Sequence, residues 1–241
     1  MKLIGIIGYK NSGKTELGVR LAKTLKDMGY KVAAIKHAPH EIELPETDTA
    51  RYLEHAAFTA AVSDQRTEIV LNGGKFIEEL LPFIDADIVI VEGFKNGKTY
   101  PRILCLAHEE DRLPLITGLE IAVAGFEGSG ADYRIDNDKD IEAMAKRVIE
   151  KSFKLPALNC THCGYEECYI MAKAIIGGEK NVMDCVAINT PVSVKIDGVS
   201  MALNPFTTKV VRNAIWGIIS SLKGAKKGDI EIKIPKEGIL E

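Results

Sequence analysis

The segment 8–15 contains the residue types of a phosphate-binding loop. It reads Gly8-Tyr9-Lys10-Asn11-Ser12-Gly13-Lys14-Thr15 and continues into Glu16. In a loop of this pattern, the backbone N–H groups surround a phosphate and the glycines allow close approach. The lysine reaches the terminal phosphates, and the threonine hydroxyl ligates Mg²⁺. We therefore predict a nucleotide site formed by residues 8–16, in which Lys14 and Thr15 are candidate catalytic residues.

A nucleotide-bound metal needs a second acidic ligand, and two carboxylates flank the apolar run 88–91. Asp87 precedes the run and Glu92 follows it. At ~3.3 Å per residue they lie about 17 Å apart, so only one can approach the phosphates. Because the phosphate loop follows the carboxyl end of a parallel strand, we expect Glu92 at the metal and Asp87 solvated at the opposite edge.

The loop after residue 36 leaves the same edge of the predicted sheet. It contains His37 and His40, followed by several acids. Two histidines without a third ligand indicate a metal site only weakly, so a switch-like or partner-facing loop is the preferred interpretation. Asp48 is expected to cap a helix, to contact the Mg²⁺ through water, or to do both. Lys95 and Lys98 face either phosphate or solvent.

Four of the five cysteines form a second chemical motif, Cys160-x2-Cys163-x4-Cys168-x16-Cys185. Thiolates suit an iron–sulfur cluster or Zn²⁺. Three of them come from one short loop and the fourth follows a predicted helix at 169–176, which favours a [4Fe–4S] cluster over structural zinc. Ligation would contribute to folding, so the apo segment should be loose. Cys105 is interpreted as a buried strand residue.

Strand and helix patterns alternate through the first 152 residues. Apolar runs at 3–7, 31–36, 88–91, 103–106 and 121–124 indicate buried strands, with shorter strands at 59–62 and 68–71 and helices after the phosphate loop and at 49–57, 76–81 and 139–151. The last helix would be capped by Asn137 or Asp138. This order predicts an α/β fold, a P-loop NTPase with a mostly parallel sheet flanked by helices.

The composition changes at Pro156, and we predict three domains, 1–152, 153–189 and 190–241. The third would be a small ββαβ unit, with two strands around Asp197-Gly198, a helix starting at Asn204-Pro205 and a last strand at 230–234. The apolar stripe of that helix comprises Val210, Val211, Ala214, Ile215, Ile218, Ile219 and Leu222. Trp216 lies off this stripe, either partly buried or as an interface anchor.

Charge and hydropathy restrict the function classes. The 241 residues contain 31 basic and 34 acidic side chains without a dense basic block, so neither nucleic-acid nor membrane binding is expected. The first apolar run is too short for a signal peptide, and no stretch reaches the roughly 18 apolar residues of a membrane span. We expect a cytoplasmic protein.

Several motifs together resemble the molybdopterin-guanine dinucleotide biosynthesis protein B (MobB) family over about residues 1–152. They are the phosphate loop, Ile35-Lys36-His37, Asp48-Thr49 with Arg51, Val91-Glu92-Gly93-Phe94-Lys95 and Pro101-Arg102. The resemblance implies a homodimer that binds GTP with Mg²⁺, hydrolyses it slowly and assists MobA, the partner that attaches GMP to molybdopterin. No Asn-Lys-x-Asp motif for guanine is present, so the choice of GTP over ATP comes from the resemblance.

The cysteine segment resembles the [4Fe–4S] domain of corrinoid iron–sulfur proteins and Rnf-type electron-transport subunits. Gly164, Ala172 and Gly178 accompany the four cysteines in this match. Together the resemblances predict a GTP-binding accessory protein, a slow GTPase, for molybdenum or tungsten cofactor maturation. Molybdoenzyme maturation proteins would be its other partners. Two alternatives stay open: an ATP-driven electron-transfer or metallocentre-insertion protein, and a binding module that holds nucleotide to order a docking surface.

Overall fold

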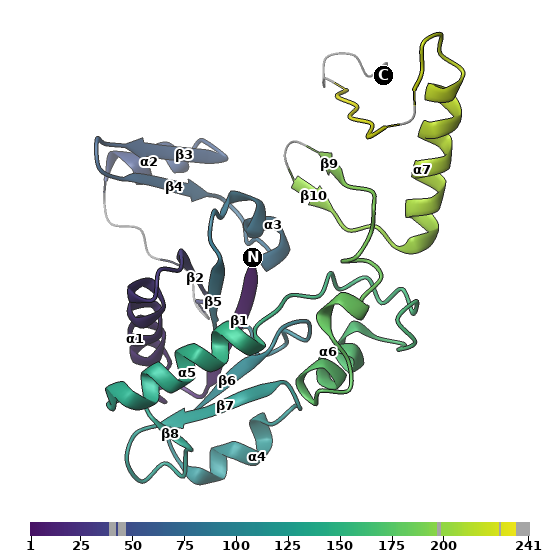
Figure 1. Ribbon diagram of the computed structural model, residues 1–241. Coiled ribbons are helices and arrows are strands. Elements are labelled where there is room, and N and C mark those ends of the chain that lie inside the picture. The colour runs from purple at the N-terminus through teal and green to yellow at the C-terminus, as the bar shows by residue number, and fades with distance from the viewer. Residues whose placement is uncertain (39–41, 43–46, 197–198, 227, 235–241) are drawn as a thin grey trace.

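The computed structural model describes residues 1–38, 42, 47–196, 199–226 and 228–234. Its centre is a parallel six-stranded sheet of order β2-β5-β1-β6-β7-β8 (Figure 1). The strands are β1 (Lys2–Gly8), β2 (Val32–Lys36), β5 (Ile88–Glu92), β6 (Arg102–Leu106), β7 (Glu120–Gly125) and β8 (Tyr133–Arg134). The predicted parallel sheet is confirmed, and the sheet brings the carboxyl ends of β1, β2 and β5 to one edge.

Helices cover both faces of this sheet, which is why its strands are continuous apolar runs. On one face, α1 (Lys14–Asp27) and α5 (Asp138–Lys151) bury Ile4 and Ile6 of β1. On the other, Leu3 and Ile7 of β1 enter two further apolar clusters. Those clusters include side chains of α3 (Ile77–Leu80), which continues into η1 (Leu81–Phe83), and of α4 (Arg112–Leu115), which follows η2 (Glu109–Asp111).

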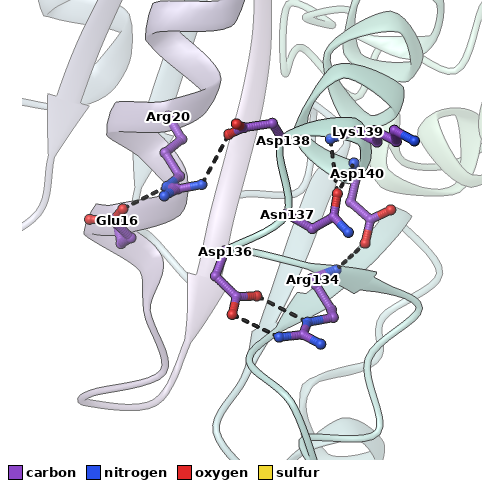
Figure 2. A network of polar contacts seen from close by, with 8 residues as sticks. All are labelled: Glu16, Arg20, Arg134, Asp136, Asn137, Asp138, Lys139 and Asp140. Carbon is purple, nitrogen blue, oxygen red and sulfur yellow. Dashed lines mark hydrogen bonds and ion pairs between the residues drawn. The ribbon is translucent and has the colours of Figure 1, made fainter.

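A polar network joins the start of α5 to α1 (Figure 2). The Arg20 guanidinium donates from Nε to Glu16 Oε1 at 2.7 Å and from Nη1 to Asp138 Oδ1 at 3.4 Å. Asn137 Oδ1 accepts from the Lys139 amide at 2.9 Å, so Asn137 is the N-cap. Exposed ion pairs stabilise little. The network therefore links α5 to the helix that follows the phosphate loop without adding much stability.

A separate unit lies apart from the main sheet (Figure 1). It consists of α2 (Asp48–Leu53) and the antiparallel pair β3 (Phe58–Val62) and β4 (Thr67–Leu71). The helix is shorter than predicted, and its N-cap is Thr47, whose side chain accepts from the Ala50 amide at 3.3 Å. The capping role predicted for Asp48 is wrong, because Asp48 already belongs to the helix while Thr47 has the extended backbone of a cap.

The cysteine segment packs against the amino ends of β6 and β7. Its helix α6 (Cys168–Ile176) ends at Gly177 and is followed by η3 (Val182–Asp184). Leu119, which precedes β7, shares a buried cluster with Phe153 and Leu155. Two hydrogen bonds support this packing, from the Leu155 amide to Thr99 O at 2.8 Å and from the Tyr169 hydroxyl to Thr117 O at 2.5 Å.

The C-terminal unit is ββα in the part of the chain that the structure describes. It contains β9 (Val194–Ile196), antiparallel β10 (Val199–Met201) and α7 (Pro205–Ser220), while the predicted Asp197-Gly198 turn lies outside the described residues. Asn204 caps α7 by accepting from the Thr207 amide at 2.8 Å. The strand predicted at 230–234 is wrong: its alternating pattern finds no paired edge, and residues 228–234 have no regular structure.

The predicted apolar stripe of α7 is only partly covered. Val210, Ile218 and Leu222 are exposed, whereas Val211, Ile215 and Ile219 are half-buried. Trp216 is 39% exposed. Among the described helices, none combines the length and the apolar character that crossing a bilayer requires.

Candidate functional site

The phosphate loop connects the end of β1 to the first turn of α1. Asn11 (φ 62°) and Gly13 (φ 87°) adopt left-handed backbone conformations that curl the loop. At Gly8, a Cβ atom would lie 2.3 Å from the Cys105 carbonyl oxygen and 2.4 Å from Ser12 Oγ. Only glycine fits at Gly8, so the sequence motif has a direct steric cause.

Two features inside this loop fit a bound phosphate. No side chain caps the N-terminus of α1, whose N-cap is Gly13, and the first-turn amides are therefore available to an anion. Ser12 is fully buried, and its Oγ has no hydrogen-bond partner within the described residues. Buried polar atoms normally have partners. An anion within the loop would supply one.

Lys14 folds back over the loop, where its Nζ donates to the Tyr9 carbonyl at 2.5 Å. Burial lowers the pKa of Lys14, an effect opposed by the negative charge of Glu92. The Lys95 ammonium lies 4.3 Å from the centre of the Tyr9 ring. Two cations thus adjoin the loop, and a phosphate anion would stabilise the charged form of Lys14.

Glu92 meets Thr15 at the edge of the sheet, as the sequence predicts. Thr15 Oγ1 donates to Glu92 Oε1 at 2.9 Å, and the Glu92 side chain is 16% exposed. Lys36 Nζ lies 3.4 Å from the same carboxylate oxygen and donates to Thr15 Oγ1 at 3.2 Å. A cation therefore already contacts the two oxygens that would hold Mg²⁺. This arrangement fits a divalent ion between Thr15 and Glu92.

Sequence reasoning placed the loop that begins at Lys36 on the phosphate side of the sheet but gave Lys36 itself no role in the site. Its position follows from the pairing of β2 with β5, in which Lys36 is the register partner of Glu92.

The opposite end of β5 is occupied by Asp87, as expected. The Asp87 carboxylate is not merely solvated, however, because Asp87 Oδ2 accepts from the Lys31 amide at 2.9 Å and so joins β2 to β5.

The backbone after Glu92 turns sharply through Gly93 (φ 89°), where a Cβ would lie 2.8 Å from the Cβ of His37. The His37 amide donates to the Glu92 carbonyl at 2.9 Å, and its ring packs edge-on against Phe94 with centroids 5.0 Å apart. His40, the other half of the weak metal hypothesis, lies outside the described residues. His37 thus packs the two loops that flank Glu92.

Arg102 holds the loop that follows Gly93. The side chain is 2% exposed, and its guanidinium donates to the carbonyl oxygens of Lys95, at 3.3 Å, and Gly97. Burial lowers the pKa of Arg102. Lys98, from the same loop, lies 5.4 Å from the centre of the Tyr169 ring on α6. The loop therefore runs from the phosphate site to the cysteine segment.

The structure does not bring every predicted residue to the metal position. The Asp48 side chain is 91% exposed, with its oxygen 3.7 Å from Arg51, and no contact joins it to Thr15 or Glu92 in the described chain. Its metal role stays a prediction. Glu16 turns along α1 to Arg20 (Figure 2), which leaves only its backbone to face the loop.

The four predicted cluster ligands line a single pocket. Cys168 and Cys185 are buried, Cys160 and Cys163 are half-buried, and all four are free thiols. Burial raises the pKa of the Cys185 thiol, and the neighbouring Cys168 and Cys163 add to this rise. Apolar side chains such as Met171 complete the lining. Four soft donors in an apolar pocket fit an iron–sulfur cluster.

Within the described residues, no three His, Cys, Asp or Glu side chains converge closely enough to hold a single metal ion. Cys105 differs from the four predicted ligands. It is fully buried in β6, and burial raises its pKa to about 12. The predicted assignment of Cys105 as a packed strand residue is confirmed.

Two protein-family models match the chain. "Molybdopterin guanine dinucleotide synthesis protein B" matches residues 3–125, and "Putative Fe-S cluster" matches residues 155–187. The "Putative molybdopterin-guanine dinucleotide biosynthesis adapter protein" of Methanocaldococcus jannaschii is 31% identical over 248 residues, which cover 98% of this chain and 99% of that protein. The Escherichia coli adapter protein is 26% identical and covers 61% of this chain and 91% of its own length.

A solved structure agrees with the fold. The crystal structure of Bacillus subtilis MobB aligns with a TM-score of 0.51 at 22% identity, over 61% of this chain and 98% of its own. The full-length match to the Methanocaldococcus jannaschii relative extends the similarity through the cysteine and C-terminal segments. The chain belongs to the MobB family.

Proposed function

We propose that this protein is a GTP-binding adapter in molybdopterin-guanine dinucleotide biosynthesis, with a [4Fe–4S] cluster in its second domain. Family membership and the names of its relatives support the pathway. The observation that carries the nucleotide part is the convergence of Thr15 and Glu92 beside the free N-terminus of α1. Its partners would be a MobA-like guanylyltransferase or other molybdoenzyme maturation proteins, and it would act as a homodimer.

The site supports binding better than rapid turnover. Lys14 would neutralise the terminal phosphates, the loop amides would orient them, and Thr15 with Glu92 would hold Mg²⁺. The bound Mg²⁺ would supply charge stabilisation at the phosphates. The sequence identifies no residue that would orient an attacking water, and the resemblance to the MobB family implies slow hydrolysis. We therefore assign slow GTP hydrolysis to the protein.

In the proposed cluster domain, Cys160, Cys163, Cys168 and Cys185 would be the four ligands. Their common pocket and the apolar lining support this assignment. The cluster would complete the core of the segment, because Cys168 and Cys185 belong to its buried apolar group.

A second function has its own support in the structure. The loop that follows Glu92 reaches Tyr169 of α6 through Lys98, and the Leu155 amide donates to Thr99 in the same loop. Nucleotide binding at Glu92 would thus be sensed near the cysteines. This connection favours nucleotide-gated electron transfer or metallocentre insertion as the alternative to an adapter role.

One experiment separates the two functions. The full chain would be purified anaerobically and assayed for iron, acid-labile sulfide, zinc and bound nucleotide. Calorimetry would then compare the affinities of the protein for Mg–GTP and Mg–ATP before and after reduction with dithionite. The adapter function predicts tighter GTP binding that reduction does not alter. Preference for ATP, or hydrolysis only in the reduced state, would instead support the redox function, and zinc in place of iron would overturn the cluster.

A further inference from the structure

A second pocket opens between the loop that follows Cys185 and the first turns of α7. Its volume is about 350 Å³, which falls within the range of small-molecule sites. One wall is formed by Asn189, Thr190 and Pro191, and the other by residues of α7. Val186 lines both this pocket and the pocket of the four cysteines. The two cavities are therefore adjacent, although their linings differ in chemistry.

The lining of this second pocket is basic. Lys209 and Arg212 both line it, and their spacing places them on the same side of α7. No Asp or Glu is among the lining residues that the structure describes, and neither cation forms an ion pair there. Residues 198–228 contain five Lys or Arg and no acid. The described lining therefore carries two positive charges and no carboxylate.

Neutral hydrogen-bonding groups accompany the two cations. Thr190 Oγ1 and Thr208 Oγ1 lie 3.0 Å apart at the junction of the two walls, and Thr208 is 8% exposed. Asn189 and Asn213 add amide groups from opposite sides. Donors of this kind, combined with one Arg and one Lys, are the groups that bind phosphate oxygens in proteins. Pro191 and Pro205 provide apolar surface beside them.

We propose that this pocket binds a small molecule that carries a phosphate group. Lys209 and Arg212 would hold the phosphate, and the remaining walls would contact the rest of the ligand. The concave form favours a small ligand over a flat macromolecular surface. This site is separate from the phosphate loop and does not depend on the nucleotide proposal.

The chain provides a local reporter of binding. Trp216 is its only tryptophan and lies one helical turn after Arg212 on α7. Calorimetry would give the affinity of the full anaerobic protein for glycerol 3-phosphate and for inorganic phosphate at constant ionic strength. Trp216 fluorescence would be followed in the same titrations. We expect saturable binding of at least one probe that changes the fluorescence, and Arg212→Gln should weaken it about tenfold or more.

Three variants distinguish this site from other causes. Lys209→Gln should also weaken binding, whereas Lys223→Gln, which changes a basic residue outside the pocket, should leave it unchanged. Lys14→Ala should retain the fluorescence change, because the phosphate loop is not its origin. Tighter binding of glycerol 3-phosphate would identify an organic phosphate ester as the ligand, and equal binding would identify free phosphate. Absence of saturable binding, equal weakening by Lys223→Gln, or loss in Lys14→Ala would overturn the proposal.

Discussion

Thr15 Oγ1 donates a 2.9 Å hydrogen bond to Glu92 Oε1, although 77 positions separate the two residues. The contact exists because β1 and β5 are adjacent parallel strands, with Ile6 paired to Glu92. The two strands therefore end side by side, and the loop after β1 returns its Thr15 to the end of β5. A hydroxyl and a carboxylate therefore meet beside the phosphate loop, at the position proposed for Mg²⁺.

Lys14→Ala should reduce the affinity for Mg–GTP by about tenfold to a hundredfold, because its ammonium would no longer reach the terminal phosphates. Calorimetry on the full chain would measure this loss. Lys10→Ala is the matched control, since Lys10 is an exposed lysine of the same loop and would contribute only through its backbone. Equal losses in the two variants would contradict a specific role for Lys14.

Gly93→Ala should destabilise the protein by at least about 2 kcal/mol, because it combines a left-handed backbone with a clash against His37. Gly73→Ala is a close control. Gly73 has a φ of 88°, nearly that of Gly93, but a Cβ there meets no atom within 4 Å. Gly73→Ala should therefore lower the free energy of unfolding by only about 1 kcal/mol, through backbone strain. Urea unfolding would compare them, and equal effects would show that the loop packing does not matter.

Tyr100→Phe should change how stability depends on alkaline pH. The Tyr100 hydroxyl is buried without a partner in the described structure, and burial raises its pKa from 10.0 to about 12. Above pH 10 the unfolded chain gives up this proton while the folded protein retains it. The contribution of Tyr100 to the free energy of unfolding is therefore complete below pH 10 and is lost as the pH rises toward 12. Between pH 9 and 11 the wild type should lose about 1.4 kcal/mol more than the variant.

Urea unfolding at several pH values would measure that difference, and the raised pKa of Cys105 cancels because both proteins contain it. Parallel pH profiles of wild type and Tyr100→Phe would contradict a buried, protonated Tyr100. At neutral pH the variant should be as stable as the wild type or slightly more stable, since no hydrogen bond within the described structure is lost.

Cys163→Ser should abolish or strongly reduce the iron and sulfide content of the anaerobically purified chain. Cys163 lines the common pocket with the other three proposed ligands, and a serine oxygen is a poorer ligand for iron–sulfur clusters than a thiolate. Cys105→Ala should keep the full iron content, because Cys105 is packed in β6. Iron retained in Cys163→Ser, or lost in Cys105→Ala, would refute the assigned ligands.

Local patterns were sufficient to predict the main sheet and the meeting of Thr15 with Glu92 at its edge. Neighbouring residues determine the apolar run before Gly8 and the motif through Thr15. The position of Glu92 follows from its place after a strand, because the carboxyl ends of parallel strands share one edge of the sheet. The N-cap at Asn204 is similarly local. These predictions succeeded because each rests on short-range geometry and on one well-established topology.

Other features depend on pairing that a sequence alone does not show. Lys36 joins the site only because β2 and β5 align it with Glu92. The strands at 58–62 and 67–71 pair with each other and form a unit apart from the main sheet. The predicted strand at 230–234 has the right alternation but no paired edge in the described chain. The alternating pattern indicates which side chains would share one face of a strand. It does not show whether another strand is available to pair with it.

The most direct test of the account measures the Mg²⁺ dependence of GTP binding in Glu92→Gln. Calorimetry would compare the wild type, Glu92→Gln and Asp48→Asn with and without Mg²⁺, with circular dichroism to verify the fold. We predict that Mg²⁺ strengthens GTP binding to the wild type. In Glu92→Gln, most of this strengthening should be lost. A smaller loss in Asp48→Asn would fit a contact through water. An unchanged Mg²⁺ effect in Glu92→Gln would contradict the metal site between Thr15 and Glu92.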